Sequence, residues 1–175
     1  MARVSLRTSF GELRPLGAEE GPLLQSLLER ELEYAEISFG LPPGAADAES
    51  QYLAGLDMVD EQQKWLLGLV EGGDLVLVLD VLDGWPSDED MTIGLLLVDG
   101  RRRRRQWGGE VVRRLEETAR ALGRSRLRVS CHVAENRNAT PFWEGNGFVE
   151  ERRFVRTETD GGERTVVLLT KAVAP

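Results

Sequence analysis

The sequence predicts a mixed α/β protein in which one central sheet carries helices on both faces. Three observations lead to this prediction. Apolar residues recur at helical spacing in two segments, apolar runs bounded by turn residues mark several strands, and helices alternate with strands along the second half of the chain. A length of 175 residues suits one domain, so we expect a single domain over residues 1–175.

The N-terminal third is expected to form one strand and two helices. Residues 1–10 alternate polar with apolar side chains, as a strand does. Apolar residues from Leu23 to Ala35 recur every three or four positions, which predicts an amphipathic helix. Prolines and glycines over 40–44 interrupt the helical pattern, and a second helix is expected near residues 47–63.

The middle of the chain is expected to form three antiparallel strands. Apolar stretches cover residues 65–70, 75–82 and 92–98. The two segments between them, 71–74 and 84–90, are rich in glycine, aspartate and proline, which favours hairpin connections.

The second half is expected to alternate helices and strands. One helix opens near Gly108 and Gly109 and is stopped by Gly123, since apolar residues between them keep helical spacing. The remaining expected elements are a strand over 127–133, a short helix over 138–144, and two strands over 149–156 and 164–172.

Composition excludes several classes of protein. The chain has one cysteine, Cys131, and one histidine, His132, so we expect no internal disulfide and no metal site. No apolar run approaches the roughly 18 residues that a membrane span needs. The first ten residues lack the continuous apolar stretch of a signal peptide, so we expect a cytoplasmic protein without a membrane partner.

Charge is divided unequally along the chain. Residues 1–90 carry five basic and 19 acidic side chains, whereas residues 91–175 carry 17 basic and 11 acidic ones. A polyanionic ligand on the second half and a cationic partner on the first half fit this division. Solvated surfaces with no such partner are the favoured explanation of the charge division by itself, because net charge indicates partners only weakly.

An anion site is expected between the strand over 92–98 and the next helix. The strand ends in Val98 and runs into a turn with five consecutive arginines, Arg101–Arg105, after which Gly108 and Gly109 open the helix. Free backbone N–H groups, the positive end of the helix dipole and cationic side chains therefore meet at one place, which suits phosphate. The lysine and hydroxyl of a nucleoside triphosphatase loop are missing.

At this turn the sequence resembles the GNAT superfamily of N-acetyltransferases. The acetyl-CoA motif of that family, Arg/Gln-x-x-Gly-x-Gly/Ala after a Val-x-Pro strand end, is matched by Val98-Asp99-Gly100 and by the segment 103–108. Gly100 replaces the proline and Gln106 replaces the first glycine. A second family pattern, Asn-x-x-Ala-x-x-Phe-Tyr-x-x-x-Gly-Phe, resembles residues 136–148.

The resemblance implies a GNAT-like fold with acetyl-CoA as co-substrate. A side chain at Gln106 implies either a shifted phosphate cradle or an amide that donates to an oxygen of the ligand. The residues that the resemblance assigns to acetyl-CoA are Leu97, Val98, Arg103, Arg104, Arg105, Gln106, Trp107, Gly108, Gly109, Asn136, Phe142 and Trp143.

Trp143 departs from the family at a catalytic position. Many members have a tyrosine there, which is proposed to protonate the leaving thiolate. An indole N–H donates a hydrogen bond but is not a usable acid, so the resemblance implies a slower reaction or another proton source. The only tyrosines are Tyr34 and Tyr52, in the N-terminal half.

The general base also departs from the family pattern. A carboxylate often stands on the strand before the acetyl-CoA loop, but this chain has Gly94 and Leu95 there. We expect Asp80 or Asp83 to take this role, with Glu36 and the acidic segment 88–90 as further alternatives. A backbone N–H near Leu97 or Val98 is expected to stabilise the oxyanion.

The resemblance implies an N-acetyltransferase in which a primary amine of a small molecule or peptide attacks acetyl-CoA directly in a ternary complex. The acidic first half favours a cationic acceptor. An acyl-CoA-binding module without transfer is the alternative. Nucleic acid would suit the arginine run but not the acidic chain as a whole, so we expect none. Family members often dimerise through late strands, and residues 166–169 are the candidate segment for a homodimer.

Overall fold

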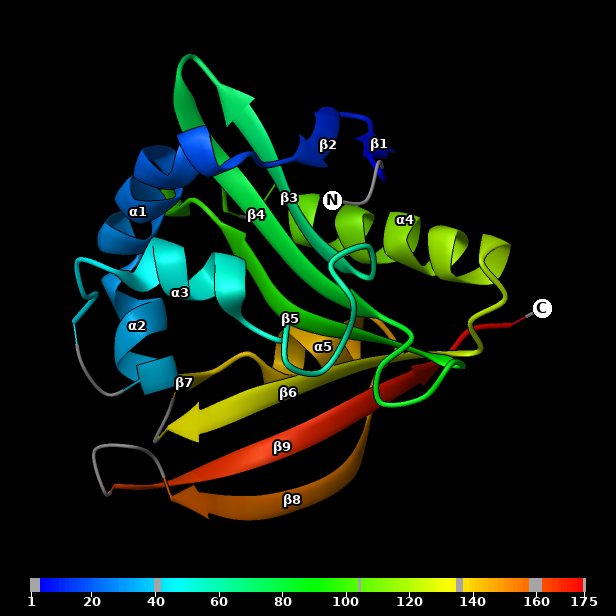
Figure 1. The fold of residues 1–175 in the computed structure, drawn as a ribbon. Coiled ribbons are helices and arrows are strands. Elements are labelled where there is room, and N and C mark those ends of the chain that lie inside the picture. The colour runs from blue at the N-terminus through cyan, green and yellow to red at the C-terminus, as the bar shows by residue number, and fades with distance from the viewer. Residues whose placement is uncertain (1–3, 40–41, 104, 135–136, 158–161, 175) are drawn as a thin grey trace.

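A computed structural model describes residues 4–39, 42–103, 105–134, 137–157 and 162–174. Figure 1 shows one twisted sheet between two layers of helices. The strands are β1 (Leu6–Thr8), β2 (Gly11–Pro15), β3 (Lys64–Glu71), β4 (Asp74–Asp83), β5 (Asp90–Val98), β6 (Arg126–Ala134), β7 (Arg137–Asn138), β8 (Val149–Thr157) and β9 (Glu163–Ala172). The helices are η1 (Ala18–Glu20), α1 (Gly21–Arg30), α2 (Leu32–Phe39), α3 (Asp47–Leu53), η2 (Gly100–Arg102), α4 (Trp107–Ala121) and α5 (Thr140–Gly145).

The strand order within the described residues is β1-β2-β3-β4-β5-β6-β9-β8, with β7 paired to β6. Neighbouring strands are antiparallel except β5 and β6, which are parallel. That parallel pairing runs only from Asp90, opposite Arg126, to Ile93, opposite Val129. Beyond this point β5 continues along β4 and β6 continues along β9, so the sheet opens between β5 and β6.

The register also shifts on the β4 side of the opening. Pairing between β4 and β5 is irregular at Asp80 and Val81. Ile93 packs in the core on the α4 side of the sheet, whereas Leu95 and Leu97 pack in the core on the α1 side. The chain therefore switches faces around Gly94, which is exposed although it lies in the middle of a buried strand.

The two faces of the sheet carry separate apolar cores, as the sequence predicted. The buried face of α4, which includes Val111, Val112 and Leu115, packs against β4, β5 and β6. On the other face, Leu24 and Leu27 of α1 pack with Ala48 of α3. The expectation of a mixed sheet with helices on both faces is confirmed.

Three expectations about the N-terminal third are wrong. The first strand is a hairpin of two short strands, β1 and β2. The helix expected from Leu23 onward is broken at Glu31, whose backbone leaves the helical conformation with φ −101° and ψ 56°. The second helix ends at Leu53, because Gly55 follows with φ +81° and so close to Leu82 that a Cβ there would lie 2.7 Å from it.

The strands and helices expected in the remaining chain agree with the structure to within two residues, whereas the short elements η2 and β7 were not expected and Asn138 lies in β7 instead of the short helix. Residues 166–169 do not form an edge, since they lie in β9 between β6 and β8 and are buried. That segment is therefore not available as a dimer contact. No helix among the described residues is long and apolar enough to span a membrane.

Candidate functional site

The opening between β5 and β6 presents backbone donors. Asp99 N–H donates to the carbonyl oxygen of Val76 on β4 at 2.9 Å. Because backbone N–H groups alternate sides along a strand, the N–H of Val98 points away from β4 and toward the opening. The N–H of Leu97 points toward β4 instead. Of the two residues expected to stabilise an oxyanion, only Val98 is placed to do so.

Helix α4 begins beside this opening. Its first intrahelical bond runs from Glu110 N–H to Gln106 oxygen at 3.0 Å, so the N–H groups of Trp107, Gly108 and Gly109 have no partner within the helix. Gln106 adopts φ 60° and ψ 12°, the left-handed conformation that glycine takes most easily. The loop therefore keeps a glycine-like backbone even though the family's glycine is replaced.

Space at the start of α4 depends on its two glycines. A Cβ built on Gly108 would lie 3.0 Å from the Phe142 ring, and one on Gly109 would lie 3.1 Å from Oδ1 of Asn146. Side chains at these positions would press on the Phe142 ring and on Asn146, so the two glycines let the start of α4 lie close to α5. Phe142 is 39% exposed, so its ring forms part of the accessible wall of the site.

The N-terminal hairpin fixes the start of α4 from the other side. Phe10 stacks on Trp107 with 4.4 Å between ring centroids. Glu110 accepts two hydrogen bonds of 2.6 Å from Ser9, one from its N–H and one from its hydroxyl. Trp107 is buried and packs in the core at the start of α4.

Most of the arginine run is already paired with carboxylates. Arg101 donates to Asp99 and lies 3.0 Å from Asp74, and Arg102 lies 2.8 Å from Glu71. The Arg101 guanidinium holds the pKa of Asp99 well below its usual range. The division of charge between the two halves of the chain is therefore partly neutralised inside the molecule.

The last arginines of the run behave differently. Arg103 pairs with Glu31 and lies 3.3 Å from Glu33. Arg105 is exposed and has no ion pair within the described part of the chain. Arg104 was also expected to bind the ligand, but it lies outside the described residues.

Glu31 connects the turn between β5 and α4 to the helices α1 and α2. Its carboxylate is 6% exposed, accepts the Gly100 N–H at 2.6 Å, and pairs with Arg103. The break between α1 and α2 therefore places a buried acid against the turn. The contact spans 69 positions, so no local sequence pattern indicates it.

A buried charged cluster lies beside the opening on the α1 side. Asp80 is 2% exposed and Lys64 is 6% exposed, with 2.6 Å between Oδ2 of Asp80 and Nζ of Lys64. Gln51 of α3 donates to the same oxygen. The other oxygen, Oδ1, is buried without a hydrogen-bond partner among the described residues. Burial raises the pKa of Asp80, and the contacts with Lys64 and Gln51 oppose that rise.

Asp83, the second base expected from the sequence, is placed elsewhere. It forms a bidentate pair with Arg124, with distances of 2.7 and 3.1 Å. Asp83 is opposite Met91, where β5 is still paired with β6 and the sheet is closed. The structure therefore brings Asp80 to the opening and not Asp83.

The aromatic residues of α5 have different surroundings. Trp143 is 4% exposed and packs edge-on against Phe148, with 5.2 Å between ring centroids. Burial raises the pKa of Cys131 to about 12, and a hydrogen bond with Trp143 opposes that rise. Trp143 is thus a core residue, whereas Phe142 lines the site. Asn136 lies outside the described residues.

Both tyrosines, Tyr34 and Tyr52, lie on the α1 side of the fold and not beside Trp143. The Tyr52 hydroxyl donates to the Gly17 oxygen at 2.6 Å, and burial raises its pKa. Tyr34 packs against the core on the α1 side. Among the described residues, no group of three or more His, Cys, Asp and Glu side chains is arranged to hold a metal.

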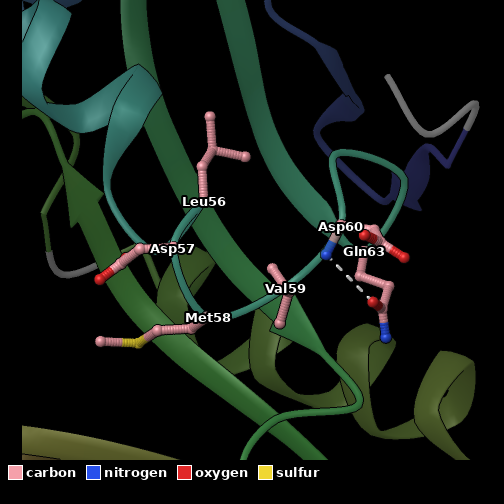
Figure 2. Close-up of a pocket in the computed structure, with 6 residues that line it drawn as sticks. All are labelled: Leu56, Asp57, Met58, Val59, Asp60 and Gln63. Atoms are coloured by element: carbon pink, nitrogen blue, oxygen red, sulfur yellow. Dashed lines mark hydrogen bonds between the residues drawn. The ribbon is translucent and has the colours of Figure 1, made fainter.

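The segment between α3 and β3 forms a hollow in front of the sheet. Figure 2 shows its lining by residues 56–60 and Gln63, with Asp57 and Met58 projecting to the same side of the segment. The N–H of Asp60 donates to Gln63 at 3.2 Å. Asp57 and Asp60 are exposed, so this edge of the α1 face is acidic.

Comparisons with known proteins agree on one fold. The acetyltransferase (GNAT) family model matches residues 25–148. A solved acetyltransferase from Thermus thermophilus has a TM-score of 0.67 and 23% identity, covering 98% of this chain and 99% of that one. No curated protein sequence matches the chain.

Two further solved structures carry more specific descriptions. One is RimL, described as a ribosomal L7/L12 alpha-N-protein acetyltransferase, with a TM-score of 0.77, 16% identity, and coverage of 97% of this chain and 94% of that one. The other is an aminoglycoside 6'-N-acetyltransferase complexed with coenzyme A, with a TM-score of 0.63, 14% identity, and coverage of 93% and 97%. At these identities the likeness shows a shared fold.

Proposed function

Because the chain belongs to the acetyltransferase (GNAT) family, we propose that it transfers an acetyl group from acetyl-CoA to a primary amine at the opening between β5 and β6. One observation carries this proposal. Asp80 is a buried carboxylate beside Gly94, the exposed position of β5 at the point where the sheet opens, and its Oδ2 lies 3.4 Å from a Cβ built on Gly94.

The residues at the start of α4 fit the co-substrate. The N–H groups of Gly108 and Gly109, which have no partner within the helix, suit a pyrophosphate together with Arg105, a cation without an ion pair in the described part of the chain. The Val98 N–H and the exposed Phe142 ring would line the path of the pantetheine arm toward the opening. The GNAT family uses acyl-CoA, and the solved aminoglycoside acetyltransferase holds coenzyme A in a fold of this kind.

Asp80 is proposed as the general base. An amine of pKa about 10 is mostly protonated at pH 7, so it must first lose one proton to solvent, and a base must then take a second proton from the nitrogen as it attacks. A bound thioester supplies an electrophilic carbon and a thiolate leaving group. As the nitrogen–carbon bond forms and the carbon–sulfur bond breaks, the Asp80 carboxylate accepts the proton that the amine nitrogen loses.

Two other steps fall to the backbone and to solvent. The Val98 N–H donates to the carbonyl oxygen as negative charge develops on it. Trp143 is buried and is not an acid, so water protonates the leaving thiolate, whose thiol has an ordinary pKa of about 8.5. We therefore expect catalysis without a protein acid.

A cationic acceptor, either a small molecule or a peptide, suits the α1 side of the opening. Asp57 and Asp60 are exposed there, and the first 90 residues carry 19 acidic side chains against five basic ones. Such a surface attracts cations at low ionic strength and does so less at high ionic strength.

The alternative is an acyl-CoA-binding module that does not transfer the acyl group. The burial of Trp143 at the usual tyrosine position favours this alternative. The two functions differ in turnover and not in binding.

Release of the CoA thiol distinguishes them. The protein is mixed with acetyl-CoA and with cationic, neutral or anionic amines at low salt and at high salt. We expect release above the uncatalysed rate, fastest with a diamine and slowed by salt. Tight acetyl-CoA binding with no release above background would support the binding module. Preference for an anionic amine at both salt concentrations would contradict the cationic acceptor.

A further inference from the structure

The carboxylate of Asp80 is held asymmetrically. Lys64 Nζ lies 2.6 Å from Oδ2, and Gln51 donates to that same oxygen, so both contacts fall on one side of the group. Oδ1 has no partner in the described part of the chain, although it is buried. A buried carboxylate oxygen without a donor is costly, so within the described residues the two contacts on Oδ2 carry the stabilisation of the charged carboxylate.

The two partners come from different layers of the fold. Lys64 opens β3 and faces the same side of the sheet as Asp80, whose position opposite Leu66 is fixed by the antiparallel register. Gln51 comes from α3 on that side. A change in either residue therefore alters Asp80 without touching α4 or its glycines.

We infer that Lys64 and Gln51 are positioning residues that hold Oδ2 of Asp80 and thereby fix the carboxylate beside Gly94, where it receives the acceptor's proton. This inference rests on the proposed function, in which Asp80 is the base. Neither residue needs to contact the substrates. Lys64 would also keep Asp80 ionised, because an opposite charge at hydrogen-bond distance favours the charged carboxylate.

The charges around Asp80 within the described residues are few. In that part of the chain, Lys64 on β3 is the only charged group that shifts the pKa of Asp80. Gln51 on α3 is neutral, and Gly94 and Leu95 on β5 carry no charge. Burial raises the pKa of Asp80, while Lys64 and Gln51 lower it. When Lys64 is removed, less counteracts the effect of burial, so the pKa of Asp80 rises further.

The test compares Lys64→Met, Lys64→Arg and Gln51→Leu in their dependence of kcat/KM on pH. We expect the acid limb to move up by about one pH unit or more in Lys64→Met, and less in Gln51→Leu. Lys64→Arg keeps the cation, so its acid limb should lie close to that of the unaltered protein. Each variant should bind acetyl-CoA as the unaltered protein does. A lower rate with an unmoved acid limb would overturn the inference.

A double-mutant cycle separates positioning from general support of the fold. In an Asp80→Asn background there is no base to position, so Lys64→Met should lower kcat/KM by less than about twofold further. An undiminished loss in that background would mean that Lys64 acts independently of Asp80, against the inference. Gln51→Leu provides the same comparison if Lys64→Met does not fold.

Failure of this inference is distinguishable from failure of the proposed function. Carbon-13 NMR follows the titration of the Asp80 carboxyl without any substrate. A higher Asp80 pKa in Lys64→Met than in the unaltered protein supports positioning, and an equal pKa overturns it. Absence of turnover in the unaltered protein, whatever the NMR titration gives, would contradict the proposed function.

Discussion

Asp80 faces Gly94 across the paired strands β4 and β5: a Cβ built on Gly94 would lie 3.4 Å from the Asp80 carboxyl carbon. Gly94 and Leu95 are the residues of this strand where the family resemblance led us to expect a carboxylate. The missing side chain leaves room, and a carboxyl group from the neighbouring strand reaches the same place. We therefore propose that the base has moved from β5 to β4 without leaving the opening.

Gln106→Gly should stabilise the protein. The left-handed backbone of Gln106 costs about 1–2 kcal/mol with a side chain present, and glycine costs about 0.5–1 kcal/mol in extra chain entropy. The expected net gain is about 0.5–1 kcal/mol in the free energy of unfolding, measured by urea titration. Gln106→Ala keeps a Cβ and should gain nothing. An equal gain in both variants would contradict backbone strain as the cause.

Arg105→Ala should weaken CoA binding by about fivefold at low salt, which corresponds to about 1 kcal/mol for one exposed ionic contact. Arg105 has no ion pair within the described residues, so its charge is available to phosphate. Arg102→Ala is the matched control, because Arg102 is held by Glu71 at 2.8 Å and should change affinity by less than about twofold. Calorimetry at two salt concentrations gives both values. Equal losses of CoA affinity in the two variants would show that an arginine's position in the run does not decide whether it binds phosphate.

Gly108→Asp should abolish binding of acetyl-CoA and of CoA. The new carboxylate would stand over the free N–H groups of α4 and repel phosphate, and its Cβ would press on Phe142 at 3.0 Å. Gly145→Asp adds the same charge in α5, where a Cβ meets nothing within 4 Å among the described residues, and should bind normally. Calorimetric titration tests both. Retained affinity in Gly108→Asp would place the ligand elsewhere.

Asp99→Asn should reduce stability in a pH-dependent way. The pKa of Asp99 is lowered in the folded protein, so its contribution is present above the ordinary aspartate pKa of about 4 and is lost as pH falls below it. We expect a loss of about 1–3 kcal/mol at neutral pH and a smaller one at a pH of about 3, by urea unfolding. Asp74→Asn, at an exposed pair, should cost less than about 1 kcal/mol. A difference that is independent of pH would contradict the ionic origin.

Local patterns predicted most of the fold. The three middle strands, α4 and the last two strands follow from apolar periodicity and from turn residues, because those signals act over a few positions. The break at Glu31 was missed because the apolar spacing continues across it. Its carboxylate contacts the Gly100 N–H, far away in the sequence, which no local pattern reports.

The candidate site was predicted only in part. The turn before α4 carries a sequence motif, whereas the ion pairs that occupy Arg101, Arg102 and Arg103 join distant positions. The sequence did not distinguish Asp80 from Asp83 as the candidate base, since both belong to the same expected strand and its turn. Lys64 and Arg124 separate them in the structure, one beside the opening and one at the closed end of the sheet.

The most direct measurement is the rate at which Asp80→Asn acetylates a diamine, followed by mass spectrometry of the product. Loss of a general base lowers a rate by about 10²- to 10⁴-fold, so we predict a fall of that size in kcat/KM with unchanged acetyl-CoA affinity. Asp83→Asn, which removes a carboxylate already held by Arg124, should stay within about threefold of the unaltered protein. Full activity in Asp80→Asn would contradict the assignment of Asp80 as the base.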